Sequence, residues 1–290
     1  MKLHRLKKQL KQEQRQTAKK NKSRRWIPLL LFLLLLATVA VPVYQHRELT
    51  APQRLFDAAV AQESLGEIVG AQRVYQRLYR DYPDSEMAPQ ALLRSAKIWQ
   101  YDRQQDQQAL LSYLQLEHDY PAHPLVLVAQ EAAAHIVKYS LRDYSRAISY
   151  YQRLLEQPTG ERDKYLYEIA DCYFRLDNYS QARIELESLL EEQPQSELLP
   201  DVLYRKGGLL LLENRIKEAR ADWQRLIDQF PGSSYSLQAG FNLAKMLEEE
   251  DHLQEALKAY QQLENYPRPA LLEEKIEHLK QRIIKKRKAI

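Results

Sequence analysis

The sequence has one cysteine, seven glycines and five phenylalanines among 290 residues, and each shortage excludes something. A single thiol, Cys172, cannot form an intramolecular disulfide or supply a four-cysteine metal site. Glycine is too scarce for the many tight turns of an all-β fold. Leu, Gln, Glu and Ala are abundant instead, and these residues lose little conformational freedom on entering a helix. We therefore expect an all-α protein.

Catalytic signatures are lacking as well. The seven histidines are scattered, and the sequence contains no H-x-x-x-H pair, no glycine-rich phosphate loop and no G-x-S-x-G elbow. The acidic run at residues 248–251 falls at a predicted helix end, where solvation is the simpler role. We expect no enzyme, no cofactor and no metal site, so function is expected on a binding surface.

The front of the chain separates into a basic stretch and an apolar stretch. Residues 1–25 hold eleven Lys and Arg against one Glu, and residues 26–44 carry no charge. As a helix, nineteen residues span about 28 Å, close to the ~30 Å hydrocarbon core of a bilayer. The sequence therefore predicts a basic cytoplasmic arm over 1–25, a transmembrane helix over 26–44 and a short linker over 45–50.

The basic cluster before the apolar stretch sets the expected orientation. By the positive-inside rule the N-terminus stays in the cytoplasm, so the chain after Tyr44 lies beyond the inner membrane, in the periplasm. The alternative is cleavage near Ala40, which would release a soluble periplasmic protein. The long basic region and Pro42 argue against cleavage. Nucleic-acid binding is disfavoured, because no aromatic residue interleaves the arm's charges before Trp26.

A proline turn recurs through the rest of the chain at intervals of 36 to 38 residues. Its prolines are Pro83, Pro121, Pro158, Pro194, Pro231 and Pro267. An alanine precedes each by eleven or twelve residues: Ala71, Ala109, Ala147, Ala182, Ala219 and Ala256. A leucine follows each alanine by seven residues, and an aromatic residue or leucine follows it by four. These spacings put all three on one helical face, and the proline ends the helix. A fixed period of this length indicates a repeat architecture.

The helix before each alanine has its own register. A small residue lies twelve positions before the alanine in the later repeats, at Ala170, Gly207 and Ala244, where two helices can approach closely. The earlier repeats match poorly, and His135 falls at this position in the third. We expect six two-helix units over 51–269. An amphipathic helix with a basic end over 270–290 should cap the last unit.

These helix pairs resemble the tetratricopeptide repeat family. The family pattern is an aromatic residue, Leu, Gly or Ala, and Tyr in the first helix, followed by Ala, an aromatic residue and a final Pro in the second. The long units with ends such as "YPDS" are similar to those of the bacterial envelope branch, which includes the barrel-assembly lipoprotein and the TolA-binding protein. No lipid-modifiable cysteine follows the apolar stretch. The resemblance implies a right-handed α-solenoid. It also implies a membrane-anchored scaffold or chaperone-like module that binds protein or peptide partners in the cell envelope.

The resemblance also implies a candidate binding surface. Residues fifteen positions before the alanine should face the concave groove, namely Tyr167, Tyr204 and Phe241, with Arg94 at the equivalent earlier position. Phe174 and Tyr101, also on first helices, are expected to join them. The alternative is that these rings pack between neighbouring units as ordinary core. Aromatic rings stand where a carboxylate-clamp lysine would be expected, so that type of binding is not expected.

Overall fold

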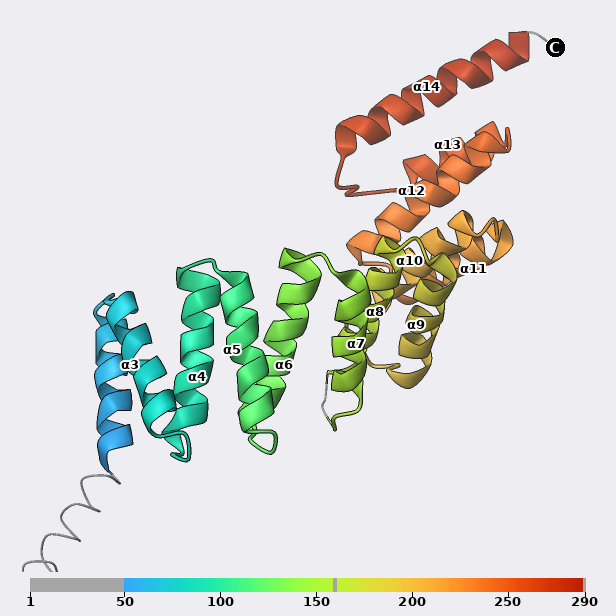
Figure 1. Ribbon diagram of the computed structural model, residues 1–290. Coiled ribbons are helices and arrows are strands. Elements are labelled where there is room, and N and C mark those ends of the chain that lie inside the picture. Colours follow the sequence, from blue (N-terminus) through green and yellow to red (C-terminus); the bar gives the residue numbers. More distant parts are fainter. Residues whose placement is uncertain (1–49, 159–160, 289–290) are drawn as a thin grey trace, which may run out of the picture. The chain divides into compact units, whose positions relative to one another are not determined.

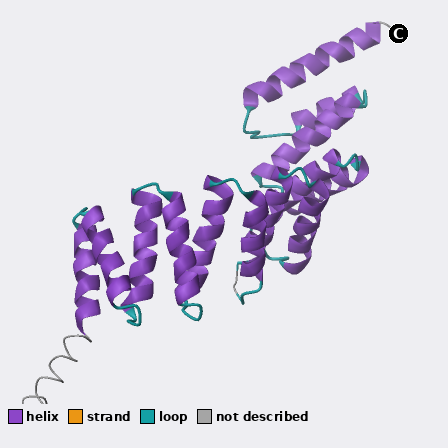
Figure 2. Ribbon diagram, viewed as in Figure 1, coloured by secondary structure: helices purple, strands orange, loops and turns teal. Residues whose placement is uncertain are grey.

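The computed structural model describes residues 50–158 and 161–288, and every regular element among them is helical (Figures 1 and 2). The all-α prediction is thus confirmed for this part of the chain. The predicted arm, transmembrane helix and all but the last residue of the linker lie outside the described residues and stay predictions. Within residues 50–158 and 161–288, no helix combines the length and apolarity needed to cross a bilayer.

Contacts group the described residues into two compact units, 50–105 and 106–288 without 159–160. In the first unit, residues 50–64 are helical, followed by α3 (Ile68–Asp81), α4 (Met87–Lys97) and the π-helical turn η1 (Ile98–Asp102). The second unit contains α5 (Asp106–Asp119), α6 (Leu125–His135), η2 (Ile136–Ser140), α7 (Tyr144–Leu155), α8 (Arg162–Arg175), α9 (Tyr179–Glu192), α10 (Leu199–Leu212), α11 (Ile216–Gln229), α12 (Ser234–Glu249), α13 (Leu253–Gln261) and α14 (Pro269–Lys288). Along the chain this order gives six helix pairs and a final helix.

The second helix of each pair buries the face that the repeat pattern predicts. All six alanines of the repeat are fully buried, with 0% exposure. The residues four positions later are buried as well: Tyr75, Tyr113, Tyr151, Leu186, Trp223 and Tyr260. The small side chain lets the partner helix approach, while the large ring beside it fills the space between helices.

The turn inside each pair has a fixed backbone conformation. One residue in each turn, five positions before the repeat alanine, has a left-handed φ between 51° and 79°. These residues are Gly66, Gln104, Arg142, Asp177, Asn214 and Asp251. Gly, Asn and Asp tolerate this region well, whereas Gln104 and Arg142 occupy it at a cost in backbone energy.

Two first helices end in a π-helical turn, and this corrects the expected register. A π turn inserts one residue into a helix. In the pairs that contain η1 and η2, the small buried residue therefore lies thirteen positions before the alanine instead of twelve. It is Ala96 in one and Ala134 in the other, and both have 0% exposure, whereas His135 is exposed. The assignment of His135 to the small-residue position was wrong for this reason.

The last helix covers the end of the second unit. Leu279 of α14 is fully buried, and Leu272, Ile276 and Ile283 pack with it against Ala244, Ala256 and Tyr260. Basic residues near the end of α14 form ion pairs with α12 and with the turn that follows it. Arg282 donates to Glu248 (2.8 Å), and Lys286 pairs with Asp251.

Candidate functional site

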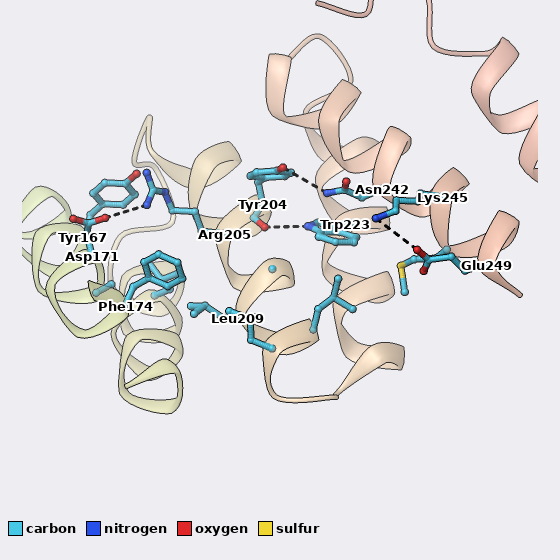
Figure 3. Close-up of a pocket in the computed structure, with 16 residues that line it drawn as sticks. Tyr167, Asp171, Phe174, Tyr204, Arg205, Leu209, Trp223, Asn242, Lys245 and Glu249 are labelled. Carbon is cyan, nitrogen blue, oxygen red and sulfur yellow. Dashed lines mark hydrogen bonds and ion pairs between the residues drawn. The ribbon is translucent and has the colours of Figure 1, made fainter. Parts of the chain in front are cut away.

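The second unit contains a groove of about 440 Å³ lined by the first helices α8, α10 and α12 (Figure 3). Leu186 of α9 and Trp223 of α11 contribute from the second helices. Most of the lining is apolar. Phe174 and Leu212 line the groove and remain exposed, at 44% and 56% of their surface. We call this hollow the α8–α10–α12 groove.

Two adjacent glycines of α10 shape the groove in different ways. A Cβ added to Gly207 would lie 2.4 Å from Nε1 of Trp223, so only glycine lets the indole approach the helix this closely. There the Trp223 Nε1 donates a hydrogen bond to the backbone carbonyl of Tyr204 (3.0 Å; Figure 3). A Cβ added to Gly208 would meet nothing within 4 Å, and Gly208 lines the groove. Gly207 therefore permits close packing, while Gly208 leaves space open.

Tyr167 and Tyr204 line the groove and also pack against their neighbours. The Tyr204 ring stacks on Trp223 with centroids 6.2 Å apart and lies 5.7 Å from the ring of Tyr235. The Tyr167 hydroxyl donates to Asp201, and burial together with this bond raises the pKa of Tyr167. Each of these two residues therefore lines the groove and packs against neighbouring residues at the same time.

The structure places the other predicted site residues differently. Phe241 is not part of the groove lining, because its ring stacks on Tyr266 (4.9 Å, 9°) and contacts Tyr260 (5.1 Å). Arg94 and Tyr101 belong to the first unit. Arg94 donates to Glu63 (2.9 Å), and Tyr101 is 68% exposed on η1. Of the six predicted residues, the structure thus brings Tyr167, Phe174 and Tyr204 together around one groove.

Charged residues at the groove mouth form ion pairs in which the acid is often the more buried partner. Asp171, 10% exposed, accepts from Lys138 (2.8 Å), Arg175 (2.8 Å) and Arg205 (3.3 Å; Figure 3). Burial alone would raise the pKa of Asp171, but the hydrogen bonds from Lys138 and Arg175 outweigh it and hold the pKa below its usual value. Arg205 itself is 42% exposed, so its guanidinium is more accessible from solvent than the carboxylate that it pairs with.

The lining of the groove contains no histidine and no cysteine. Among the described residues, no group of three or more His, Cys, Asp or Glu side chains could hold a metal ion. Cys172 is buried, and burial raises the pKa of its thiol to about 11, so the thiol is protonated at neutral pH.

The sequence analysis did not identify Trp223 or Gly208 as groove residues. Trp223 is visible in the sequence only as the aromatic member of the fifth repeat, and Gly208 follows a repeat position without belonging to it. The pair Gly207–Gly208 in a helix was the available signal. Of the seven glycines in the chain, only these two are adjacent, and glycine inside a helix needs a packing or spatial reason.

Comparison with known proteins supports the repeat assignment. Tetratricopeptide repeat models match residues 139–199 and, in a second model, residues 55–85 and 201–233. A tetratricopeptide repeat protein from Parabacteroides merdae superposes with a TM-score of 0.51 at 16% identity, covering 79% of this chain and 99% of its own. The C-terminal part of a repeat-containing protein from Cytophaga hutchinsonii gives 0.54 at 17% identity, covering 74% and 80%. These likenesses show a shared fold. No curated protein matches the sequence.

Proposed function

Because the chain contains tetratricopeptide repeats, which form protein–protein interaction modules, we propose that its α8–α10–α12 groove binds the apolar side chains of a partner polypeptide. The observation that supports this proposal is the apolar hollow that Gly208 leaves open between three first helices. A hollow lined by apolar and aromatic side chains with a few polar groups is the usual form of a binding site.

Individual residues take distinct parts in the proposed binding. Trp223 and Met246, both nearly buried, lie deep in the lining, whereas Phe174 and Leu212 are exposed and would lose their contact with water on binding. Each Å² of apolar surface removed from water contributes roughly 25 cal/mol. Asn242 lies 3.5 Å from the Tyr204 hydroxyl, so both polar groups can also bond to a peptide backbone.

Filling the groove should abolish this binding without unfolding the protein. We expect Gly208→Leu to occupy the open space, and leucine in place of a helical glycine should stabilise α10 by up to about 0.8 kcal/mol. A benzophenone amino acid at Leu212 should give a discrete photo-crosslinked adduct in cells, and Gly208→Leu should remove it.

Ala221→Leu is the control for this test, because Ala221 is exposed on α11 and the change places a leucine side chain on a helix surface away from the groove. The adduct should persist in this variant. An adduct of equal yield in the Gly208→Leu protein, or none in the otherwise unaltered chain, would contradict the proposed role of the groove.

We further propose that the module is held in the bacterial cell envelope by residues 26–44, with the arm over 1–25 in the cytoplasm. The charge pattern of the sequence and the length of its apolar stretch support this placement. The alternative is a soluble periplasmic partner of an envelope complex, released by cleavage near Ala40.

Washing membranes with alkaline carbonate should leave the full-length chain in the pellet. A shortened form in the supernatant would favour the alternative. Alkaline phosphatase fused after Ile290 should be active, and an inactive fusion would overturn the orientation.

A further inference from the structure

A second hollow of about 270 Å³ lies in the same unit, and its chemistry differs from that of the groove. Its lining comes from η2, from the turn that precedes α7, from α7 and from α8: Lys138, Tyr139, Arg142, Tyr144 and Arg175. Three of these five side chains are cations and two are phenols. We propose that this cationic hollow binds a carboxylate of the same partner whose apolar side chains enter the α8–α10–α12 groove. The inference therefore rests on the proposed function.

The charges around the hollow leave one cation unmatched. Lys138 is 1% exposed and is held by Glu168 and Asp171, and Arg175 donates its Nε to Asp171 (2.8 Å). Of the three cations that line the hollow, Lys138 and Arg175 thus pair with Glu168 and Asp171, and Asp171 also accepts from Arg205 outside the hollow. No ion pair joins Arg142 to any acid among residues 50–158 and 161–288. A single added carboxylate would neutralise this excess, and a guanidinium binds a carboxylate with two parallel hydrogen bonds.

Exposure decides which charge an incoming group meets. Asp171 is 10% exposed and Glu168 25%, whereas Arg175 is 45% exposed and Arg142 is exposed. Asp171 therefore lies beneath Arg175, whereas Lys138 lies beneath both carboxylates. Arg175 also lies against the ring of Tyr144, with its Cζ 5.5 Å from the ring centroid, which fixes the plane of the guanidinium.

The backbone at Arg142 is a separate observation that points to use of its side chain. Arg142 has φ 54°, in the left-handed region where four of the six equivalent turn residues are Gly, Asn or Asp. An arginine here costs more backbone energy than those residues would. Strain of this kind collects at functional positions. Gln104 occupies the same conformation in another turn (φ 51°), so a glutamine side chain is also compatible with it.

The two hollows border the same helix. Asp171 lines the groove and Arg175 lines the cationic hollow, and these residues are one turn apart on α8, which is about 6 Å along the helix axis. Asp171 also joins them chemically, because it accepts from both Arg175 and Arg205. An extended chain advances about 3.3 Å per residue, so an acidic group two to five residues from an apolar anchor would reach both sites.

Peptide selection against the purified full-length chain tests this inference. Two libraries of random peptides would be used, one ending in a free carboxylate and one with that terminus blocked. We expect the unaltered chain to enrich peptides with an apolar anchor and a carboxylate at a fixed spacing. If acidic peptides are also enriched from the blocked library, the bound carboxylate belongs to a side chain. If enrichment requires the free terminus, the bound group is the terminal carboxylate. Against Arg142→Gln the apolar preference should remain and the acidic preference should be lost, while Arg142→Lys should retain both.

One enriched peptide then gives a quantitative check. We expect Arg142→Gln to weaken its binding about fivefold, and replacing the peptide carboxylate by an amide to weaken binding to the unaltered chain by a similar factor. The two changes together should cost no more than either alone, which shows that the two groups contact each other.

The possible failures are distinguishable. Enrichment of apolar peptides without an acid would overturn the carboxylate site and leave the groove proposal standing. An acidic preference that survives Arg142→Gln would also overturn it, because the carboxylate would then be bound elsewhere. If the unaltered chain enriches nothing beyond what the Gly208→Leu protein enriches, the proposed function fails and this inference fails with it.

Discussion

Replacing Gly207 by alanine should destabilise the second unit by about 3 kcal/mol, at the upper end of what overpacking a core usually costs. The added Cβ would lie 2.4 Å from Nε1, 2.6 Å from Cδ1 and 2.8 Å from Cε2 of Trp223. The obstacle is a rigid ring system and not the end of a flexible chain, so no rotamer change relieves it. To make room, the indole must leave the helix and give up its bond to the Tyr204 carbonyl. The single methyl group of alanine cannot replace the hydrogen bond and the packing that the indole loses.

The measurement is a thermal melt followed by circular dichroism, together with amide hydrogen exchange. Repeat proteins unfold by neighbouring units, so exchange should accelerate first in α10 and α11. Gly208→Ala is the matched control, because it makes the same chemical change one residue away where the Cβ meets nothing within 4 Å. That variant should be unchanged or more stable by up to about 1 kcal/mol. Equal melting temperatures for the two alanine variants would show that Trp223 can move without cost.

The fold was predictable because the repeat pattern appears six times. The buried alanine, the large residue four positions later and the proline stop follow from helical periodicity alone. The first helices of the second and third pairs were not predictable in the same way. A π turn depends on how a helix end meets its neighbours, and the residues of η1 and η2, "IWQYD" and "IVKYS", carry no distinctive signal. One inserted residue then moves the small position from 135 to 134.

The candidate site was predictable only in part, and the reason is also physical. A repeat offset finds Tyr167 and Tyr204, because both lie on the same face of successive first helices. The offset fails at Phe241, where Tyr266, just before the last repeat proline, stacks on the ring. It cannot find Gly208, whose contribution is the absence of a side chain, or Arg142, whose position depends on turn geometry. Periodicity predicts what every repeat shares, whereas binding sites depend on where repeats differ.

Replacing Lys138 by methionine should destabilise the second unit by about 3 kcal/mol, because it removes the buried cation that Glu168 and Asp171 share. Lys138 is 1% exposed, and its ammonium bonds Glu168, Asp171 (2.8 Å) and the backbone carbonyl of Glu168 (3.4 Å). Methionine fills a similar volume but donates nothing. The two acids would then face each other near a buried position, and their mutual repulsion adds to the loss.

Calorimetry at pH 7 should show the fall in melting temperature. Lys164→Met, which breaks an exposed pair with Glu161, should show no change.

The pH dependence distinguishes an electrostatic cause from simple loss of packing. In the unaltered chain the pKa of Asp171 is held below its usual value, so its ionised form stabilises the fold above about pH 4, the unfolded pKa, and this stabilisation disappears as pH falls through the lower folded value. Without Lys138, the pKa of Asp171 should rise towards its value in the unfolded chain, because only Arg175 and Arg205 then oppose the effect of burial. The ionised carboxylate would then stabilise the variant less than the unaltered chain at neutral pH, and this disadvantage disappears once the carboxyl is protonated in both. The difference in melting temperature should therefore shrink as pH falls from 7 to about 3, with most of the change below about pH 4. A difference that stays constant over this range would assign the effect to packing around Lys138 and not to its charge.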